Sequence, residues 1–310
     1  MNHSVKEFLK TYVRPPLIPT FRRFIQDFPN VAGKRSVVRK IAPRITGADY
    51  SCEAPTCFGA KMKGNTKDLI DRYIYFFGVW EPNITAFISR RLAPGDVFVD
   101  VGANVGYFSL VASIIVGEGG GVVAIEASPS IVRALESNIA LNSLKNIRIA
   151  NVAASDQRGT LRLYYGTEHN RGRASIYGND GSVLEAEVPS LPLTDILERH
   201  EQRRARVIKI DVEGAEWLVS RGLGPLLTHG RDDLEVIMEV NPECLAATGQ
   251  STESLVGMFT DARFYPYAVA NDYSFESYIP PRRLLVPTRI RGPIHEQTDI
   301  VFSRIDAEQL

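Results

Sequence analysis

The sequence lacks long hydrophobic runs, a surplus of charge of either sign, and more than three cysteines. No apolar stretch approaches the roughly 18 residues of a transmembrane helix, and charges and prolines interrupt the region where a signal peptide would be apolar. Lys and Arg number 36, as do Asp and Glu, so no global field favours nucleic acid or an anionic membrane. The cysteines form neither a metal-ligand spacing nor an even disulfide set, which favours reduced thiols. These absences predict a soluble, cytoplasmic protein with no nucleic-acid partner and no membrane span.

The length of 310 residues is ample for one large domain with an N-terminal extension. Residues 1–64 carry scattered Arg, Lys and Pro with little periodicity, and we expect a loosely structured extension there. Its Arg22-Arg23 and Lys34-Arg35 pairs are expected to be solvated charge. The domain proper is expected over residues 65–310, beginning with a helix capped by Thr66 and ended by Gly78.

From about residue 94 to 262, short apolar runs alternate with helical patterns, which predicts a right-handed and mostly parallel α/β sheet. The last two strands have no helix between them and suggest an antiparallel hairpin at the edge of the sheet. The expected fold is therefore a Rossmann-like sheet of seven strands with an antiparallel last strand. The expected strands are Val97–Val101, Val122–Glu126, Ile147–Ala153, Arg206–Asp211, Leu234–Glu239, Phe264–Ala270 and Asp299–Arg304.

The first of these strands leads into the turn Asp100-Val-Gly-Ala-Asn-Val-Gly106. Gly102 and Gly106 permit a tight turn with a close backbone approach, and the helix that follows presents free N–H groups at the carboxyl edge of the sheet. The spacing is not the dinucleotide pattern G-x-G-x-x-G. An acid before the first glycine suits a cationic ammonium and would repel a pyrophosphate. S-adenosylmethionine has such an ammonium and no phosphate.

The second strand also ends in an acid, Glu126, about 20 residues after Gly106. An acid at this place in a βαβ unit can accept hydrogen bonds from both ribose hydroxyls of an adenosine. A solvated strand end is the alternative. Ser128-Pro129 then indicates the start of a helix that runs to Asn142.

With these motifs and Lys209-Ile-Asp-Val-Glu-Gly-Ala-Glu216 in order, the chain from about Asn65 to Arg304 resembles the FkbM-type methyltransferases. Gly78-Val-Trp-Glu-Pro82 and Glu239 also fit that pattern, whereas Ala127 stands where the family often has Pro. The resemblance implies a class I fold and S-adenosylmethionine-dependent O-methylation of a hydroxyl on a sugar, a glycan or lipid-linked glycan, or a polyketide. It implies these roles: the methionine end of the cofactor at Asp100, Gly102, Asn104 and Gly106, the ribose at Glu126, the adenine at the backbone near Ala153, and methyl transfer beside Asp211 and Glu213.

Methyl transfer to a hydroxyl benefits from a group that takes its proton. Asp211, at a strand end, is the first candidate and Glu213 the second, while Glu216 is expected to be a first-turn helix acid. His295 could face the acceptor but is more often inert at such a place, and Lys209 in a buried strand needs a partner carboxylate.

Two further sites are open to alternatives. Glu81, between two apolar helices, could reach the cofactor or the acceptor, or could simply be a helix-start carboxylate. Asp211, Glu239 and Asn241 could supply oxygen ligands to Mg²⁺, but strand-end acids are common without metals, and no metal is expected.

Two other functions are compatible with the same βαβ unit at the start of the sheet. A nicotinamide-dependent oxidoreductase is disfavoured by the glycine spacing and by the lack of a Tyr-x-x-x-Lys pair, and a non-catalytic binding protein is disfavoured by the intact acids. The acceptor pocket is expected to be built from the 65–92 helices and the loops 166–182 and 272–298. In the long loop from Asn271 to Thr298, Tyr273, Phe275 and Tyr278 could offer faces to a sugar ring, and an irregular surface loop is the alternative. The sequence carries no readable code for the acceptor or for the oligomeric state.

Overall fold

The computed structural model describes residues 14–28, 33–45, 48–165, 174–175, 183–212, 214–280 and 282–310. The chain divides into two compact units: unit 1 is Met1–Thr85 with Asn271–Leu284, and unit 2 is Ala86–Ala270 with Leu285–Leu310. Each unit is described by itself. None of the described helices combines the length and the apolar character needed to cross a bilayer.

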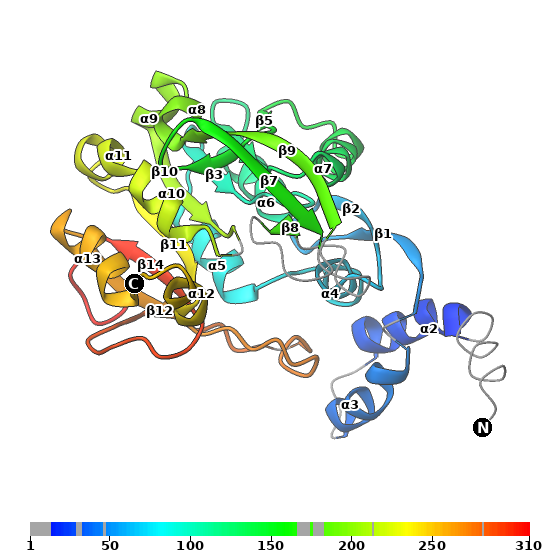
Figure 1. Cartoon of the computed structure of the whole chain (residues 1–310). Helices are drawn as coiled ribbons and strands as arrows, with labels where there is room; N and C mark the ends of the chain where they lie inside the picture. Colours follow the sequence, from blue (N-terminus) through cyan, green and yellow to red (C-terminus); the bar gives the residue numbers. More distant parts are fainter. Residues whose placement is uncertain are drawn as a thin grey trace. The chain divides into compact units, whose positions relative to one another are not determined.

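Unit 2 is built around a sheet. The order of its strands is β13 (Thr288–Arg289), β12 (Tyr265–Val269), β14 (Thr298–Ser303), β11 (Glu235–Val240), β10 (Ala205–Ile210), β3 (Val97–Val101), β4 (Gly121–Ile125) and β5 (Ile147–Ala150). Figure 1 labels its strands β5, β3, β10, β11, β14 and β12. The pairs from β11 to β5 are parallel, whereas β14 is antiparallel to both of its neighbours. This confirms the predicted class I, Rossmann-like sheet.

The last two strands confirm the predicted antiparallel pairing near the edge of the sheet. Within the pair, β14 is the inner strand and lies between β11 and β12. Ile300, Val301 and Phe302 of β14 are fully buried and alternate between the two faces of the sheet, so burial on both faces stabilises this interior place. The edge is formed by the two-residue strand β13, which the sequence pattern did not indicate.

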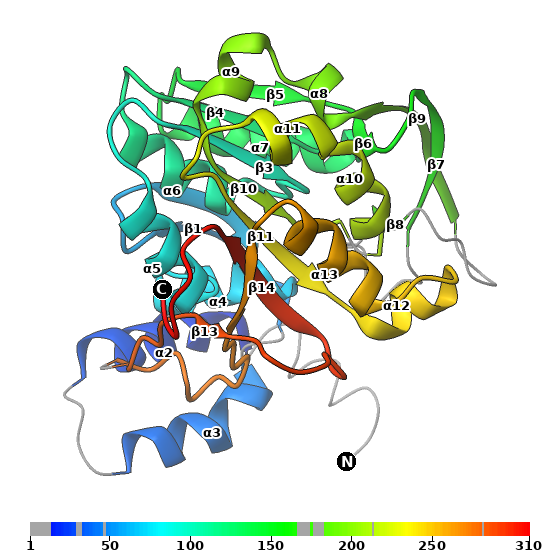
Figure 2. The ribbon, with the colours of Figure 1, turned by 90° about the vertical axis from the view of Figure 1, so that its left-hand side faces the viewer.

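Helices cover both faces of this sheet, which explains why β3 and β10 are buried at every position. On one face lie α6 (Tyr107–Val116) and α7 (Pro129–Leu141), and Leu135 of α7 packs on Ala124 of β4. The larger core lies on the other face. Figure 2 shows α6 and α10 on opposite sides of the strands. The helices contributing to the larger core are α8 (Leu193–Ile196), α10 (Glu216–Gly222), α11 (Gly224–His229), α12 (Pro242–Ala247) and α13 (Thr252–Asp261); α9 (Arg199–Arg204) leads directly into β10.

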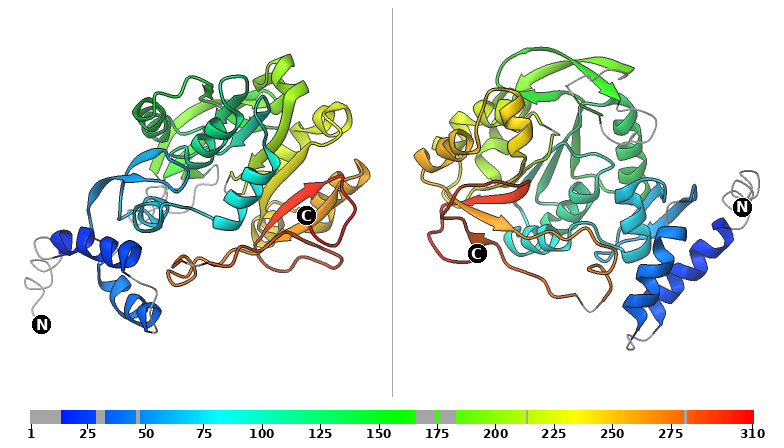
Figure 3. Two further views of the ribbon diagram at one scale, coloured as in Figure 1. Left: turned by 180° about the vertical axis from the view of Figure 1, so that it is seen from behind. Right: turned by 60° about the horizontal axis from the view of Figure 1, so that its bottom comes forward.

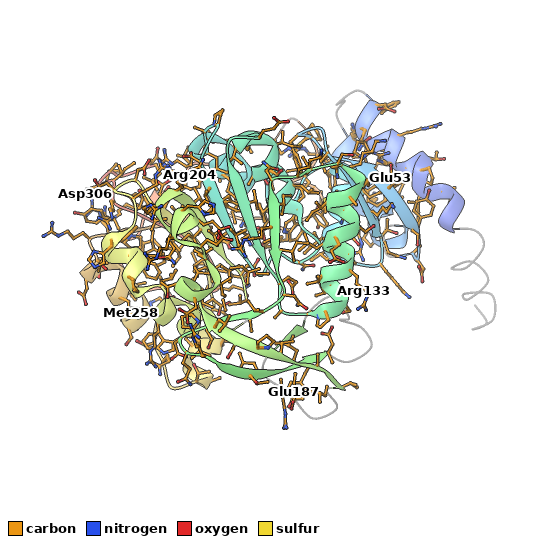
Figure 4. The ribbon with its side chains drawn as sticks, turned by 90° about the horizontal axis from the view of Figure 1, so that it is seen from above. Glu53, Arg133, Glu187, Arg204, Met258 and Asp306 are labelled. Atoms are coloured by element: carbon orange, nitrogen blue, oxygen red, sulfur yellow. The ribbon has the colours of Figure 1, made fainter. Side chains whose placement is uncertain are left out.

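A second sheet in unit 2 has the order β6 (Ala153–Ser155), β9 (Val183–Pro192), β7 (Gly159–Tyr165) and β8 (Ala174–Ser175). Its long β7–β9 ribbon is shown in green in Figure 3. Figure 4 places Glu187 of β9 far from Arg204, which precedes β10 at the amino end of the main strands.

The predicted strand Ile147–Ala153 is divided between the two sheets, so the prediction was wrong at its end. The cause is a tight turn in which the Val152 N–H donates to the Ala150 carbonyl. The Asn151 side chain fixes this turn by donating to the carbonyls of Glu126 (2.8 Å) and Ala127 (2.9 Å).

Unit 1 comprises α2 (Arg14–Asp27), α3 (Lys34–Ile45), a hairpin of β1 (Ser51–Pro55) and β2 (Lys61–Asn65), α4 (Leu69–Phe77) and the segment 271–284. The unit boundary falls within α5 (Pro82–Arg91). Aromatic rings hold the later segment on α4: Tyr73 contacts Phe275 and Tyr278 at ring-centroid distances of 5.5 and 4.5 Å. Tyr278 is 1% exposed, so it does not offer a face to a sugar as suggested above.

The start of α4 also corrects a prediction. Asp68, not Thr66, caps the helix, because its carboxylate accepts the N–H groups of Ile70 (2.9 Å) and Asp71 (3.3 Å). The Thr66 hydroxyl is buried and donates to the Ala48 carbonyl instead. Gly78 ends the helix in a left-handed conformation, as expected.

Candidate functional site

The turn after β3 draws the ends of three neighbouring strands together. The N–H groups of Gly102 and Ala103 both donate to the Ile125 carbonyl at the end of β4, at 2.9 and 3.0 Å. On the other side, a Cβ at Gly102 would lie 1.8 Å from the carbonyl oxygen of Asp211, and the residue has φ +81°. Only glycine fits here, because any side chain would displace the strand that carries Asp211.

Asp100 lies buried at this edge and is 1% exposed. Its Oδ2 accepts a hydrogen bond from the Ser109 hydroxyl of α6 at 2.6 Å, whereas its Oδ1 has no hydrogen-bond partner among the described residues. Burial raises the pKa of this carboxyl, and the Lys209 ammonium opposes the rise. A buried carboxylate oxygen without a partner is costly, and a cationic ligand would relieve that cost. Sequence reasoning did not find Ser109.

Glu126, just past β4, is buried and bonded at both oxygens. Its Oε2 accepts the Asn104 N–H and its Oε1 the Ser128 N–H, each at 2.9 Å. Asn104 can donate in this way because it adopts a left-handed conformation with φ +50°. Burial raises the pKa of Glu126 to about 7 despite these hydrogen bonds. The structure therefore joins the glycine turn directly to the predicted ribose acid.

Lys209 and Asp211 complete the edge on β10. Lys209 pairs with Asp100 in the parallel register, so both side chains lie on one face of the sheet. The Lys209 ammonium donates to Asp211 Oδ2 at 2.7 Å and lies 4.7 Å from the centre of the Phe108 ring. This confirms the prediction that the buried lysine needs a carboxylate partner. The Asp211 side chain remains 32% exposed.

The loop after Asp211 is shaped by Glu216 at the first position of α10. Its Oε1 accepts the N–H of Gly214 at 3.1 Å and that of Val212 at 3.4 Å, and burial raises its pKa to about 7. Glu216 is thus a first-turn acid, as expected. The helix begins at Glu216 itself. Glu213 itself, the second catalytic candidate, lies outside the described residues.

A comparison with protein families identifies the kind of domain that contains this edge of the sheet. Residues 100–245, which include Asp100, Glu126, Asp211 and Glu216, match the family model described as "Methyltransferase FkbM domain". Residues 100–245 are thus an FkbM-type methyltransferase domain. This confirms the resemblance noted in the sequence, and the family makes S-adenosylmethionine the cofactor.

Similarity to individual proteins is more limited. A probable cobalt-precorrin-6B C(15)-methyltransferase (decarboxylating) of Sulfolobus acidocaldarius is 39% identical over 69 residues, which are 22% of this chain and 36% of that protein. The chain thus matches about a third of that relative's length. Among solved structures, precorrin-6y C5,15-methyltransferase of Geobacter metallireducens has 13% identity and a TM-score of 0.40, covering 71% of this chain and 86% of its own. Aeropyrum pernix fibrillarin with bound S-adenosyl-L-methionine has 13% identity and a TM-score of 0.37, covering 71% and 73%.

The remaining predicted residues lie apart from the central turn of the FkbM domain. Ala153 is buried in β6 of the second sheet. Glu239 Oε1 accepts a hydrogen bond from Gln297 at 2.6 Å, and the Asn241 amide contacts the same glutamine at 3.4 Å. Among the residues that the structure describes, no three His, Cys, Asp or Glu side chains form a metal-binding group. His295 is exposed.

Glu81 belongs to unit 1 and precedes the matched FkbM segment. It is 5% exposed and has φ +41°, a conformation that costs a non-glycine residue energy. Its Oε1 accepts the Tyr273 hydroxyl at 2.8 Å, and its N–H donates to the Tyr278 hydroxyl at 3.2 Å. These contacts tie Glu81 to the segment 271–284. Its proposed contact with the cofactor stays a prediction.

Proposed function

We propose that this protein transfers the methyl group of S-adenosylmethionine to a hydroxyl oxygen of a sugar, a glycan or lipid-linked glycan, or a polyketide-type molecule. The observation that carries the proposal is the gathering of Asp100, Glu126 and Asp211 at the carboxyl ends of three adjacent strands, within the segment that matches the FkbM domain. Ligands of open α/β sheets bind at this edge.

The described side chains fit the cofactor. Asp100, Lys209 and Asp211 together carry a net negative charge when ionised, and the Asp100 Oδ1 would receive the cofactor's ammonium. Each Glu126 oxygen already accepts one N–H and retains a second lone pair for a ribose hydroxyl. Glycine at position 102 lets the Asp211 backbone lie directly against the turn, which brings Asp211 close to this site. When bound, the cofactor supplies a methyl group activated by a sulfonium.

We assign the proton-accepting role to Asp211. Its Oδ2 is held by Lys209, while the side chain is partly exposed at the edge where an acceptor would enter. The Asp211 carboxylate would take the proton of the acceptor hydroxyl, whose oxygen would receive the methyl group that the cofactor supplies. General-base assistance of this kind contributes roughly 10²–10⁴ in rate. Lys209 fixes the position of the carboxylate and shields it from Asp100.

Calorimetry and activity together test the proposal. Wild-type protein should bind S-adenosylmethionine and not NAD⁺, and Glu126→Ala should weaken that binding by about 1.5–3 kcal/mol, the cost of losing hydrogen bonds to a charged group. A panel of sugars, glycans and polyketides with methyl-labelled cofactor should then yield a labelled ether. Binding of NAD⁺ instead would favour a nicotinamide-dependent enzyme, and cofactor binding without transfer to any acceptor would favour a non-catalytic protein.

A further inference from the structure

A bulge in β9 directs one acid toward the candidate cofactor site. In the β7–β9 ladder, Leu163 pairs with Ala186 and Tyr164 with Leu184, so Glu185 is the extra residue on its strand. Bulges of this kind change the direction of a side chain. The next acid along, Glu187, follows the regular ladder, is exposed, and pairs with Arg162 at 2.9 Å.

The Glu185 carboxylate holds the start of α7. Its Oε1 accepts the hydroxyls of Ser128 at 2.5 Å and Ser130 at 2.7 Å, and the Ser130 N–H at 3.3 Å. Ser128 is also the residue whose N–H donates to Glu126 Oε1. A chain of hydrogen bonds therefore runs from the second sheet through Ser128 to Glu126.

Glu185 also acts on Glu126 by charge. Burial is the main cause of the raised pKa of Glu126, and the negative charge of Glu185 adds to it. The two acids thus interact both through Ser128 and through space.

We propose that Glu185 is a positioning residue for cofactor binding, which orients the Glu126–Ser128 turn toward the ribose and couples the second sheet to cofactor affinity. This inference rests on the proposed function, because it takes Glu126 to be the ribose acid. The local sequence pattern does not indicate this role of Glu185, because Glu185 and Ser128 are 57 residues apart in the chain.

The test measures the dissociation constant of S-adenosylmethionine between pH 6 and 8 for wild type, Glu185→Gln, Glu185→Ala and the matched control Glu187→Gln. Glu185→Ala removes the acceptor of both hydroxyls and should weaken binding about tenfold at pH 8. Glu185→Gln keeps an acceptor oxygen and should bind almost normally at pH 8. It should hold that affinity to lower pH, because Glu126 loses a neighbouring negative charge. Glu187→Gln should match wild type throughout.

A wild-type pH profile in Glu185→Gln would overturn the inference, as would unchanged affinity in Glu185→Ala. Should the alanine variant fail to fold, the glutamine profile still decides, because a purely structural role would not move it. If the wild type itself does not bind S-adenosylmethionine, the proposed function fails instead.

A second inference rests on charge in unit 1. Between Arg14 and Ile45 the sequence has eight Lys or Arg and one acid, Asp27, although the whole chain is neutral. Some of these cations have internal roles: Arg22 donates to the Tyr75 carbonyl, and Lys34 to the carbonyls of Ile25 and Phe28. Others are exposed on the two helices, namely Arg23, Arg35, Arg39 and Lys40.

The exposed cations do not favour α3 itself. Arg35 is near the amino end of the helix, where the macrodipole disfavours positive charge, and Arg35 and Arg39 form a like-charge pair four residues apart. An ion pair of Arg39 with Glu276 is long, at 3.9 Å. In the same part of the chain, Phe28 is 49% and Val37 41% exposed.

We infer that the α2–α3 helix pair docks on an anionic lipid surface. Cations would bind the headgroups while the exposed apolar side chains enter the interface, which distinguishes this surface from one that binds nucleic acid. The surface is independent of the methyl-transfer site.

Co-sedimentation of the full chain with lipid vesicles tests this. The protein should bind phosphatidylcholine vesicles that contain about 30% phosphatidylglycerol, which gives them a negative surface potential. It should not bind vesicles of pure phosphatidylcholine, and high salt should abolish the binding. Charge reversal of Arg35, Arg39 and Lys40 to Glu should abolish binding. The same reversal at the exposed Lys145, Arg199 and Arg203 should not. Equal effects of the two triple variants, or binding to an oligonucleotide in preference to vesicles, would overturn the inference.

Discussion

At the scale of single residues, one buried lysine sets the charges of the candidate site. Lys209 interacts with two acids: Asp100, its register partner on β3, and Asp211, which follows the end of β10. One cation cannot neutralise both, so the edge keeps a negative charge for a cationic ligand. Asp211 is the more exposed of the two acids and is thus the one that can meet an acceptor.

Replacing Asp211 by Asn keeps its size and one acceptor oxygen but removes its basicity. We expect kcat to fall about 10²-fold or more while cofactor affinity changes little. Steady-state kinetics and calorimetry measure the two quantities. Asp195→Asn is a suitable control, because Asp195 also forms a 2.7 Å ion pair, with Arg158, away from the site. Collapse of cofactor binding in Asp211→Asn would make this residue an anchor for the ligand, and unchanged turnover would move the base elsewhere.

Glu216 should make stability depend on pH. Its pKa is about 7 in the folded protein, against an ordinary value of 4.5, so the folded state holds a proton that the unfolded chain releases. Its stabilising contribution is therefore complete below about pH 4.5 and is lost as the pH rises to 7. Glu216→Gln can still accept the Gly214 N–H, and the fall in unfolding free energy between pH 5 and 8 should be smaller than in wild type. Urea unfolding at four pH values measures this; parallel curves for the two proteins would contradict it.

At the scale of elements, the site depends on how closely β3 and β10 approach at Gly102. A Cβ there would meet the Asp211 backbone, which cannot move without shifting β10. Gly102→Ala should therefore lower the free energy of unfolding by at least about 2 kcal/mol. Gly119→Ala is the control, since nothing lies within 4 Å of a Cβ at that position, and it should change stability by no more than about 0.5 kcal/mol. Equal denaturation midpoints for the two variants would refute this reading of the turn.

The elements also show which features can be predicted from sequence. Strands such as β3 are marked by their own apolar residues, and the glycine turn and Glu126 follow them directly, so local pattern suffices. The insertion of β14, the turn at Asn151 and the bond from Glu185 to Ser128 depend on residues far apart in the chain. In α2 and α3, interior prolines and many cations obscure the helical pattern, so the sequence led us to expect a loosely structured extension there.

At the scale of the whole molecule, the acids proposed to bind the cofactor at the β3–β10 edge all lie in unit 2. S-adenosylmethionine at 100 times its dissociation constant should raise the free energy of unfolding by about 2.7 kcal/mol, by mass action on the folded state. Chemical denaturation with and without the cofactor measures this. Hydrogen exchange should slow in β3, α6 and β4 and stay the same in α2 and α3. NAD⁺ at equal concentration should leave both measurements unchanged, and protection confined to unit 1 would contradict the placement.

The interior position of β14 also has a consequence for biosynthesis. As the ribosome releases the chain, β11 is complete at Val240, but its neighbour in the sheet begins only at Thr298. At about 5–20 residues per second, β11 presents an unpaired edge for several seconds. An open edge of this kind can pair with another nascent chain. Aggregation during translation should therefore depend on how soon residues 298–303 emerge.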